Sequence, residues 1–340
     1  MKIENLYNFF FIFLFFQIGN IFSQDFHYSQ FENNPFFLNP AMVGNFDAKY
    51  RIIANHRNQW RAITVPYKTY SFSLDGKFQI FKMQNTKIGG GLQINSDKAG
   101  DSNFSNDIFN FSISLHQKIN EKYTFSVALM SAYQQFSIDM KNLKFNNQYD
   151  NHNNFYNPEL KHNEKLYNDN NFLLDFSIGS LLKYSIDKKR NLSFGLSIFH
   201  INNSKFSFFN NDNVRLNRKY IVFFGGNLFW KNFEIHPSLQ YMRQDKFNEL
   251  DLGGKLKFDI NNNFIFAIYA GIWHRWKDAE IFLIEFEFQN LNLGISYDIN
   301  SSKLIEVSNG KGAFEISIIY MFGKMKIIKD YYKEVCPVFM

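Results

Sequence analysis

The sequence lacks the features that define several protein classes. Beyond the N-terminus it has no run of about eighteen apolar residues, so a bundle of membrane-spanning helices is excluded. One cysteine and six prolines in 340 residues exclude disulfide scaffolds and proline-rich linkers. Charge is nearly balanced, with 37 Lys and Arg against 31 Asp and Glu, and the small excess is spread along the chain. We therefore expect no nucleic-acid partner.

The sequence is instead rich in aromatic side chains. It has 43 Phe, 18 Tyr and 4 Trp, which together make 19% of the residues, while apolar residues as a group make 45%. A soluble core of ordinary size does not require so many rings. The chain therefore has more apolar surface to cover than a conventional core provides.

The first 23 residues have the pattern of an N-terminal signal peptide. Lys2 precedes an unbroken apolar run over residues 9–16, and the small residues Gly19 and Ser23 follow it. A membrane anchor is the alternative interpretation, but the run is too short to cross about 30 Å of hydrocarbon. No cysteine follows the run directly, so the pattern of a lipid attachment site is missing. We expect residues 1–23 to be removed and the mature chain to be exported.

Most of the remaining chain alternates between apolar and polar side chains, which is the pattern of strands with two different faces. Between positions 109 and 115, for example, apolar residues alternate with Asn110, Ser112 and Ser114. The same period of two recurs in residues 123–130, 282–289 and 313–322. Helical periodicity is not convincing in any segment, so the expected fold class is all-β.

The alternating segments predict about fourteen antiparallel strands. The links between them alternate in length: 187–190 and 231–232 are short, whereas 138–171 and 203–214 are long. An even strand number with short turns at one end and long loops at the other is typical of an outer-membrane β-barrel whose termini both lie in the periplasm. The predicted strands are 49–60, 67–79, 86–97, 104–118, 122–137, 172–186, 191–202, 215–230, 233–244, 247–259, 264–275, 280–289, 291–300 and 313–323.

The apolar face of these strands decides between a transmembrane barrel and a soluble fold. A soluble β-sandwich or propeller also alternates, but its apolar face need only fill a shared core. Here nearly every strand carries three or four large apolar residues, more than the strands can bury against one another. In a transmembrane antiparallel β-barrel these residues contact outer-membrane lipid, and the other face lines a wide lumen that suits water or a polar plug. Residues expected in the lumen include Ser71, Ser73, Asn110, Ser112, Ser126 and Ser317.

The first predicted strand supplies candidates for the two aromatic girdles of the membrane band. Tyr50 and Trp60 share parity and lie ten residues apart. At the usual strand tilt this separation rises about 23 to 25 Å, the height of the apolar band. A ligand contact is the alternative role for Trp60. The opposite parity places Arg51, Asn55, Arg57 and Gln59 in the lumen.

Closure of the barrel pairs the first strand with the last and brings Arg57 near Glu315. Both residues have inward parity and lie near the outer end of this seam. We hypothesise a lumenal ion pair between them that helps to fix the closing register. Side chains on opposite faces of the wall would refute this hypothesis.

Motifs at both ends of the mature chain resemble a known family. The N-terminal part contains Ser29-Gln30-Phe31, then Asn39-Pro40-Ala41 with Gly44, and then Arg57-Asn58-Gln59-Trp60. The C-terminal part contains Glu315-Ile316-Ser317 and Cys336-Pro337-Val338-Phe339. Together these motifs resemble the PorP/SprF family of outer-membrane proteins, which is associated with type IX secretion and gliding motility. The final Met340 and the Asn-rich middle of the chain depart from the family pattern.

The resemblance implies a non-enzymatic component of the type IX secretion and gliding machinery in the outer membrane of a Gram-negative bacterium. Its implied partners are a secreted surface protein such as an adhesin and periplasmic secretion or gliding components. The family-motif residues that are candidates for this function are Ser29, Gln30, Asn39, Pro40, Ala41, Gly44, Arg57, Asn58, Gln59 and Trp60.

Residues 24–46 lie between the signal peptide and the barrel, which we place at 47–323. Pro35, Pro40 and Gly44 break the chain and direct it into the first strand, because proline fixes φ and glycine permits positive φ. The alternative interpretation is a periplasmic docking segment or a plug.

Two further segments are candidates for partner contact. Residues 139–171 form the longest loop and mix lysines with aromatic residues, which suits an extracellular protein or an anionic glycan, or a solvated loop with no partner. The tail, residues 324–340, carries four lysines and is expected in the periplasm, where a secretion component is a candidate partner. Its Cys336 is either a spectator thiol or the site of a mixed disulfide.

Catalytic and cofactor motifs find little support. The eight histidines are scattered, and the motifs H-E-x-x-H and G-x-S-x-G do not occur. Gly89-Gly90-Gly91 has neither a following helix nor a phosphate-loop lysine, so it indicates strand packing or a bend. We expect no catalytic residue, cofactor or metal. Two functions remain: a secretion component, and a passive outer-membrane porin or solute transporter, which a polar lumen allows.

Overall fold

The computed structural model describes residues 25–323, apart from 64, 80–82, 84, 101, 140–142, 144, 151–154, 158, 161–169, 188, 209–213, 231–232 and 261–263. The predicted signal peptide, residues 1–23, lies outside the described residues. So do the tail, residues 324–340, and Cys336.

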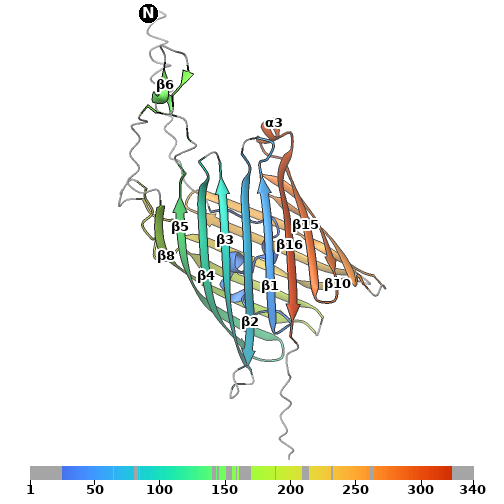
Figure 1. Ribbon diagram of the computed structural model, residues 1–340. Coiled ribbons are helices and arrows are strands. Elements are labelled where there is room, and N and C mark those ends of the chain that lie inside the picture. The colour runs from blue at the N-terminus through green and yellow to red at the C-terminus, as the bar shows by residue number, and fades with distance from the viewer. Residues whose placement is uncertain are drawn as a thin grey trace, which may run out of the picture.

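The described chain forms a closed antiparallel barrel of fourteen strands, as the sequence predicts (Figure 1). Each strand pairs with its neighbours in chain order, and β1 closes the ring by pairing with β16. The barrel strands are β1 (Tyr50–Gln59), β2 (Tyr67–Gln79), β3 (Thr86–Ala99), β4 (Phe104–Lys118), β5 (Tyr123–Ser137), β8 (Asn170–Ser185), β9 (Asn191–Phe199), β10 (Lys219–Trp230), β11 (Phe233–Gln244), β12 (Phe247–Asp259), β13 (Ala267–Arg275), β14 (Ala279–Glu287), β15 (Leu291–Asn300) and β16 (Lys311–Phe322).

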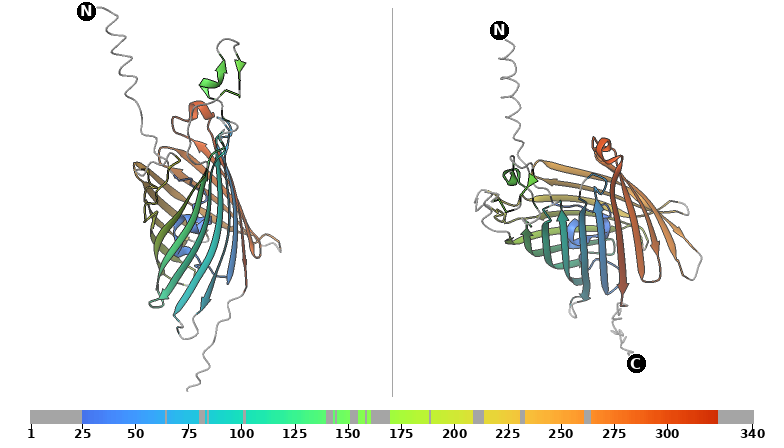
Figure 2. Two further views of the ribbon diagram at one scale, coloured as in Figure 1. Left: turned by 60° about the vertical axis from the view of Figure 1, so that its left-hand side comes forward. Right: turned by 45° about the horizontal axis from the view of Figure 1, so that its top comes forward.

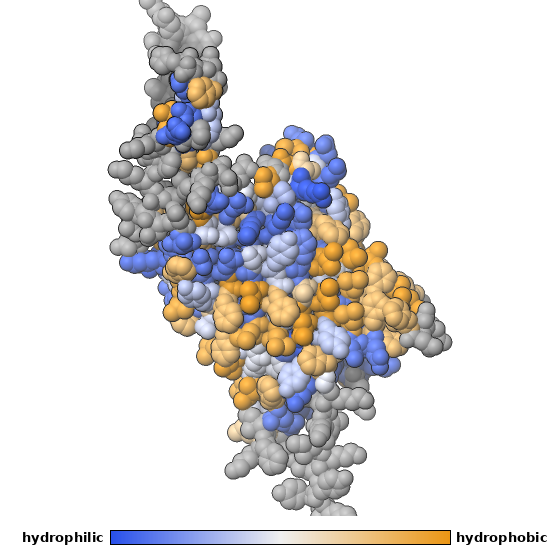
Figure 3. Space-filling view, viewed as in Figure 1, coloured by the Kyte–Doolittle hydropathy of each residue, from blue (hydrophilic) through white to orange (hydrophobic). Residues whose placement is uncertain are grey.

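The two faces of the barrel wall differ as the alternation predicts. On β4, Phe109, Phe111 and Ile113 are exposed on the outer face, whereas Ser112 and Ser114 are buried on the lumenal face. The space-filling view shows hydrophobic side chains gathered in a band across the wall, with hydrophilic residues above it (Figure 3). This outer band covers about the part of the wall that lipid contacts in outer-membrane barrels. Among the described residues, no helix is long and apolar enough to cross a membrane.

The connections divide the barrel into two ends. The links after β1, β5, β9 and β15 lie at what we call the loop end, and the links after β4, β8 and β14 lie at what we call the turn end. The link after β5 contains a 3-10 turn, η4 (Asn146–Gln148), and a small hairpin of β6 (Tyr149–Asp150) and β7 (Phe155–Tyr156), and the link after β15 contains α3 (Ile305–Ser308). Sequence alternation did not predict the hairpin, since each of its strands has two residues. In outer-membrane barrels the long loops face the cell exterior.

Residues 25–46, which we call the plug segment, lie inside the barrel. The segment contains η1 (Phe31–Asn33), α2 (Pro35–Leu38) and η2 (Pro40–Met42), and Figure 2 shows these short helices within the wall. Their apolar side chains pack into a core inside the lumen. That core joins Phe31, Phe36, Leu38, Ala41 and Val43 of the plug segment to Ala128, Met130, Leu181, Phe199, Ile221, Phe223, Met242, Trp273, Ile281 and Leu283 of the wall. The plug segment therefore bridges strands on several sides of the lumen.

Candidate functional site

The plug segment runs the length of the lumen from the loop end to the turn end. Asp25 contacts His200 and Lys219, which lie where β9 ends and β10 begins at the loop end. Gly44, near the other end of the segment, donates its N–H to Asp75 on β2 at 2.8 Å. The sequence predicts a barrel whose two termini lie at the same end, and Tyr50 of β1 and Phe322 of β16 are partners at the turn end. The first described residue instead lies at the loop end, because the segment passes through the lumen before it enters β1.

The Asn39-Pro40-Ala41 motif forms the last helical turn of the plug segment. Asn39 caps η2 by accepting the Ala41 N–H at 2.9 Å, and Pro40 occupies the first helical position, where its missing N–H costs nothing. The Asn39 amide also donates to the backbone carbonyls of Ser180 and Leu196, at 2.8 Å and 3.2 Å. The Asn39 side chain therefore caps η2 with its amide oxygen and bonds the barrel wall with its amide nitrogen. Ala41 is fully buried.

Gly44, near the end of the plug segment, adopts a backbone conformation that suits glycine. Its φ is +76°, which a residue with a Cβ adopts only with strain. A Cβ at this position would also lie 2.7 Å from the Cα of Gly89 on β3. Gly44 therefore allows the chain to turn from the lumen toward β1 while it lies against the wall.

Glycines on the wall provide the space in which the plug segment lies. A Cβ on Gly89 would meet the carbonyl oxygen of Val43 at 2.4 Å, and a Cβ on Gly179 would meet the Asn39 side chain. A Cβ on Gly294 would lie 2.5 Å from the side-chain oxygen of Gln30. By itself, the Gly89-Gly90-Gly91 pattern predicts only strand packing or a bend. Glycines at inward positions of several strands were the signal that could have identified a segment packed inside the lumen.

Ser29 and Gln30 anchor the upper part of the plug segment to β16. The backbone N–H groups of Ser29 and Gln30 donate to the Glu315 carboxylate at 2.8 Å and 3.2 Å. The Gln30 side chain donates to Ser296 at 3.1 Å and accepts from Ser317 at 2.6 Å. The motif serine and glutamine thus bind the last two strands of the barrel.

A buried charge cluster surrounds Ser29 at the seam. Arg57 and Glu315 are register partners across β1 and β16, and their side chains form a lumenal ion pair at 3.2 Å. Both side chains are almost fully buried, and Arg57 also contacts Asp298 at 3.1 Å. Arg275 reaches the same Asp298 at 3.2 Å from the other side. Burial of charges is unfavourable unless they are paired, so this cluster fixes the relative positions of the plug segment and the seam.

A second charge cluster holds the start of the plug segment at the loop end. Asp25 accepts hydrogen bonds from Lys219 at 2.7 Å and contacts His200 at 2.8 Å, and His200 also contacts Asp175 at 2.9 Å. Burial alone would lower the pKa of His200, but Asp25 and Asp175 outweigh burial and raise this pKa to about 9. Burial would raise the pKa of Asp25, but Lys219 and His200 hold it well below its usual range. The ionised aspartate and the protonated histidine therefore stabilise each other near neutral pH.

The remaining predicted residues of β1 divide between the two faces. Tyr50 lies at the turn end beside Phe322 and Phe78, with ring centroids 5.4 Å and 6.2 Å away. Asn58 has outward parity and is in register with Phe314. The structure differs at Trp60, which lines a cavity inside the loop end. β1 ends at Gln59 and Trp60 has φ of +59°, so strand parity does not extend to it.

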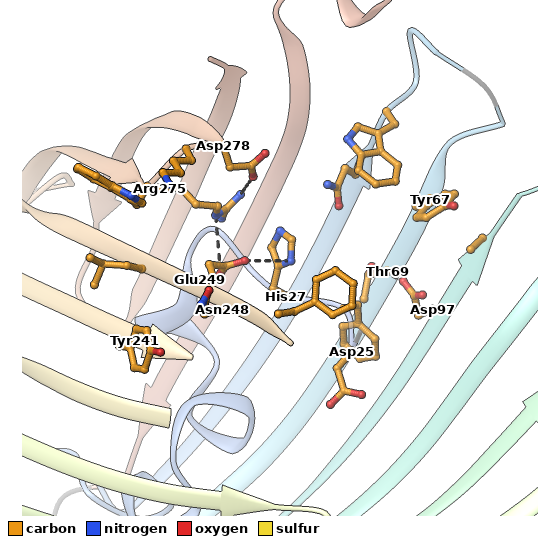
Figure 4. A pocket seen from close by; sticks show the side chains of 18 of the residues that line it. Asp25, His27, Tyr67, Thr69, Asp97, Tyr241, Asn248, Glu249, Arg275 and Asp278 are labelled. Atoms are coloured by element: carbon orange, nitrogen blue, oxygen red, sulfur yellow. Dashed lines mark hydrogen bonds and ion pairs between the residues drawn. The ribbon is translucent and has the colours of Figure 1, made fainter. Parts of the chain in front are cut away.

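The cavity that Trp60 lines lies at the loop end, and we call it the vestibule. Its volume is about 830 Å³. Asp25, Phe26 and His27 of the plug segment form part of its lining, together with residues of β1–β4 and of β11–β13. Figure 4 shows Glu249, Arg275 and His27 on one side and Tyr67, Thr69 and Asp97 on the other. No group of three or more His, Cys, Asp or Glu residues in the described part of the chain is arranged to hold a metal ion.

Comparison with known proteins assigns the chain to a family. Residues 20–320 match the family described as "Type IX secretion system membrane protein PorP/SprF". The chain belongs to the PorP/SprF family. This PorP/SprF protein is thus an outer-membrane component of type IX secretion. No curated protein matches the chain.

Solved barrels are similar to this PorP/SprF protein at low sequence identity. The CymD monoaromatic hydrocarbon channel is 10% identical, with a TM-score of 0.49 over 86% of this chain and 93% of that chain. The toluene transporter TodX of Pseudomonas putida is 8% identical, with a TM-score of 0.48 over 87% and 94%. BamA from Haemophilus ducreyi lacking POTRA domains 1-3 is 8% identical, with a TM-score of 0.42 over 81% and 70%.

Proposed function

We propose that this PorP/SprF protein assists the secretion or surface attachment of a partner protein, such as an adhesin, as a barrel closed by its own N-terminal segment. The observation that carries the proposal is the plug segment. Its apolar residues pack against strands around the lumen, and its polar residues bond the wall from Asp25 at the loop end to Gly44 at the turn end. A barrel filled in this way suits a docking or gating component better than a passive pore.

The alternative function is a porin or solute transporter. The polar lumenal face and the vestibule favour this alternative, because polar side chains inside a wide barrel suit the passage of a hydrated solute. The lumenal core of Phe31, Phe36 and Leu38 argues against it, since these side chains occupy the space that a solute would need.

The two functions differ in a deletion strain and in a planar bilayer. We expect deletion of the gene to deplete one or more proteins from the cell surface, and we expect the purified barrel to show little ion conductance. Reintroduction of the full-length gene should restore surface display. Robust conductance of the purified barrel together with normal surface display in the deletion strain would refute the proposal and support the porin.

A further inference from the structure

The vestibule carries more carboxylates than cations. Its lining includes Asp25, Asp97, Glu249 and Asp278 against Arg275 and Lys277. Asp25 is paired with Lys219, which does not line the cavity, whereas Arg275 already pairs with Asp251 and Asp298 on the lumenal face. Carboxyl groups therefore outnumber the cationic side chains that line the vestibule.

Glu249 is a nearly buried carboxylate of the vestibule with one unsatisfied oxygen. Its side chain is 9% exposed, and its Oε1 atom accepts no hydrogen bond from any described residue. The nearest basic side chains approach this carboxylate only at long range: Arg275 Nε lies 3.7 Å from Oε1, and the His27 imidazole Nδ1 lies 3.5 Å from Oε2. Figure 4 shows this carboxylate between His27 and Arg275, directed into the cavity. A buried carboxylate oxygen without a donor is costly, so a donor supplied by a ligand would be favourable.

Asp97 provides a second carboxylate on the opposite side of the vestibule. It comes from β3, and its Oδ1 accepts a hydrogen bond from Thr69 at 2.6 Å. Within the described part of the chain, Asp97 forms no ion pair. A cationic group that enters the vestibule can therefore contact a carboxylate on either side of the cavity.

Aromatic side chains also line the vestibule. Trp60 and Tyr67 line the vestibule on the side of Asp97, with ring centroids 5.0 Å apart (Figure 4). The face of an aromatic ring attracts a guanidinium or ammonium group, and Arg also stacks on such rings. A volume of about 830 Å³ is within the usual range for pockets that bind a compact ligand. Carboxylates and rings together favour a basic peptide over an acidic or neutral one.

We propose that the vestibule binds an arginine-bearing or lysine-bearing segment of a partner protein at the cell surface. The cationic side chain lies between Glu249 and Asp97 and stacks on the surrounding rings. The inference rests on the proposed function, because it specifies the chemistry of the partner that the barrel holds. It places the contact at the loop end, where the vestibule opens and where outer-membrane barrels face the exterior.

Peptide binding to the full-length mature barrel in detergent tests this inference. The probes are tetra-arginine and tetra-glutamate, and binding is measured by isothermal titration calorimetry at low and high salt. We expect tetra-arginine to bind with one site per barrel, to weaken as salt rises, and tetra-glutamate not to bind. Glu249→Gln and, on the opposite wall, Asp97→Asn should each weaken tetra-arginine binding about tenfold or more.

The matched control is Asp187→Asn. Asp187 is an exposed carboxylate in the turn after β8, at the opposite end of the barrel, so its loss should leave the affinity unchanged. Each variant is first checked for the folded barrel by its heat-dependent shift in gel mobility. Equal affinity of tetra-arginine for the wild type and for both vestibule variants would overturn the inference, and so would comparable binding of tetra-glutamate.

Surface display separates failure of this inference from failure of the proposed function. If deletion of the gene removes a surface protein but the Glu249→Gln and Asp97→Asn barrels retain it and bind tetra-arginine normally, the vestibule inference is wrong and the function stands. If deletion of the gene leaves surface proteins unchanged, the proposed function is wrong whatever the peptide binding shows.

Discussion

Replacement of Arg57 by methionine should strongly destabilise the barrel. Methionine keeps most of the apolar volume but removes the cation that lies 3.2 Å from Glu315 and 3.1 Å from Asp298. Removal of one partner from a buried ion pair costs about 3 to 5 kcal/mol, because the other charge remains buried and unpaired. Arg275 still contacts Asp298 in the variant. We therefore expect a loss near the lower limit, about 3 kcal/mol in the free energy of unfolding.

A double-mutant cycle identifies the ion pair as the cause of this loss. Glu315→Gln removes the charge that Arg57→Met leaves unpaired, so the double variant should be more stable than the sum of the single losses predicts, by about 1 to 3 kcal/mol. Arg190→Met is the control, because the ion pair of Arg190 with Asp187 is exposed and should contribute less than about 1 kcal/mol.

The assay is urea unfolding of the barrel in detergent micelles, followed by tryptophan fluorescence. Two results would refute the reasoning. One is an Arg57→Met barrel within about 0.5 kcal/mol of the wild type, and the other is a double variant whose loss equals the sum of the two single losses.

Three further predictions concern the plug segment and the loops. Gly89→Ala should displace the plug segment and raise the conductance of the barrel in a planar bilayer, because the added Cβ would lie 2.4 Å from the Val43 carbonyl oxygen. Gly90→Ala is the control and should leave the conductance unchanged, because a Cβ on Gly90 has its nearest neighbour at 4.0 Å. Equal conductance of the two variants would contradict this prediction. The contribution of protonated His200 to holding Asp25 is fully present below about pH 6.5 and is lost as pH rises through about 9. The conductance of the wild-type barrel should therefore rise between pH 7 and pH 10, whereas that of His200→Gln should be high at both values. A flat wild-type profile would refute this prediction. Deletion of residues 145–168 should leave the barrel assembled but abolish retention of the surface partner; unchanged retention, measured by labelling of intact cells, would exclude a role for this loop.

The sequence predicted the barrel wall well because one physical constraint acts along every strand. Lipid on one side and a polar interior on the other impose a period of two, so the predicted β4 at 104–118 and β11 at 233–244 agree with the structure. The same parity, together with closure of the ring, placed Arg57 opposite Glu315. The alternation of apolar and polar residues therefore predicts the pairing register of two strands as well as their positions in the sequence.

The interior of the barrel was harder to predict because its contacts join distant parts of the chain. Asp25 meets Lys219, and Ser29 meets Glu315, across separations that no local pattern encodes. The plug segment itself has no period of two. The interpretation of Trp60 as a girdle residue extended the strand by one residue beyond its end, where a positive φ directs the ring into the vestibule.

The position of the plug segment also determines an order of assembly. The segment continues directly into β1, and β1 is one side of the junction that makes the wall a ring. A ring that joined first would leave only narrow ends through which some twenty residues would have to thread. We therefore expect this segment to take its position before β1 pairs with β16, and because the Ser29 N–H bonds Glu315 of β16, we expect closure of the ring to depend on that position. A barrel that closes without its N-terminal segment in position lacks one of the contacts that hold the ring together.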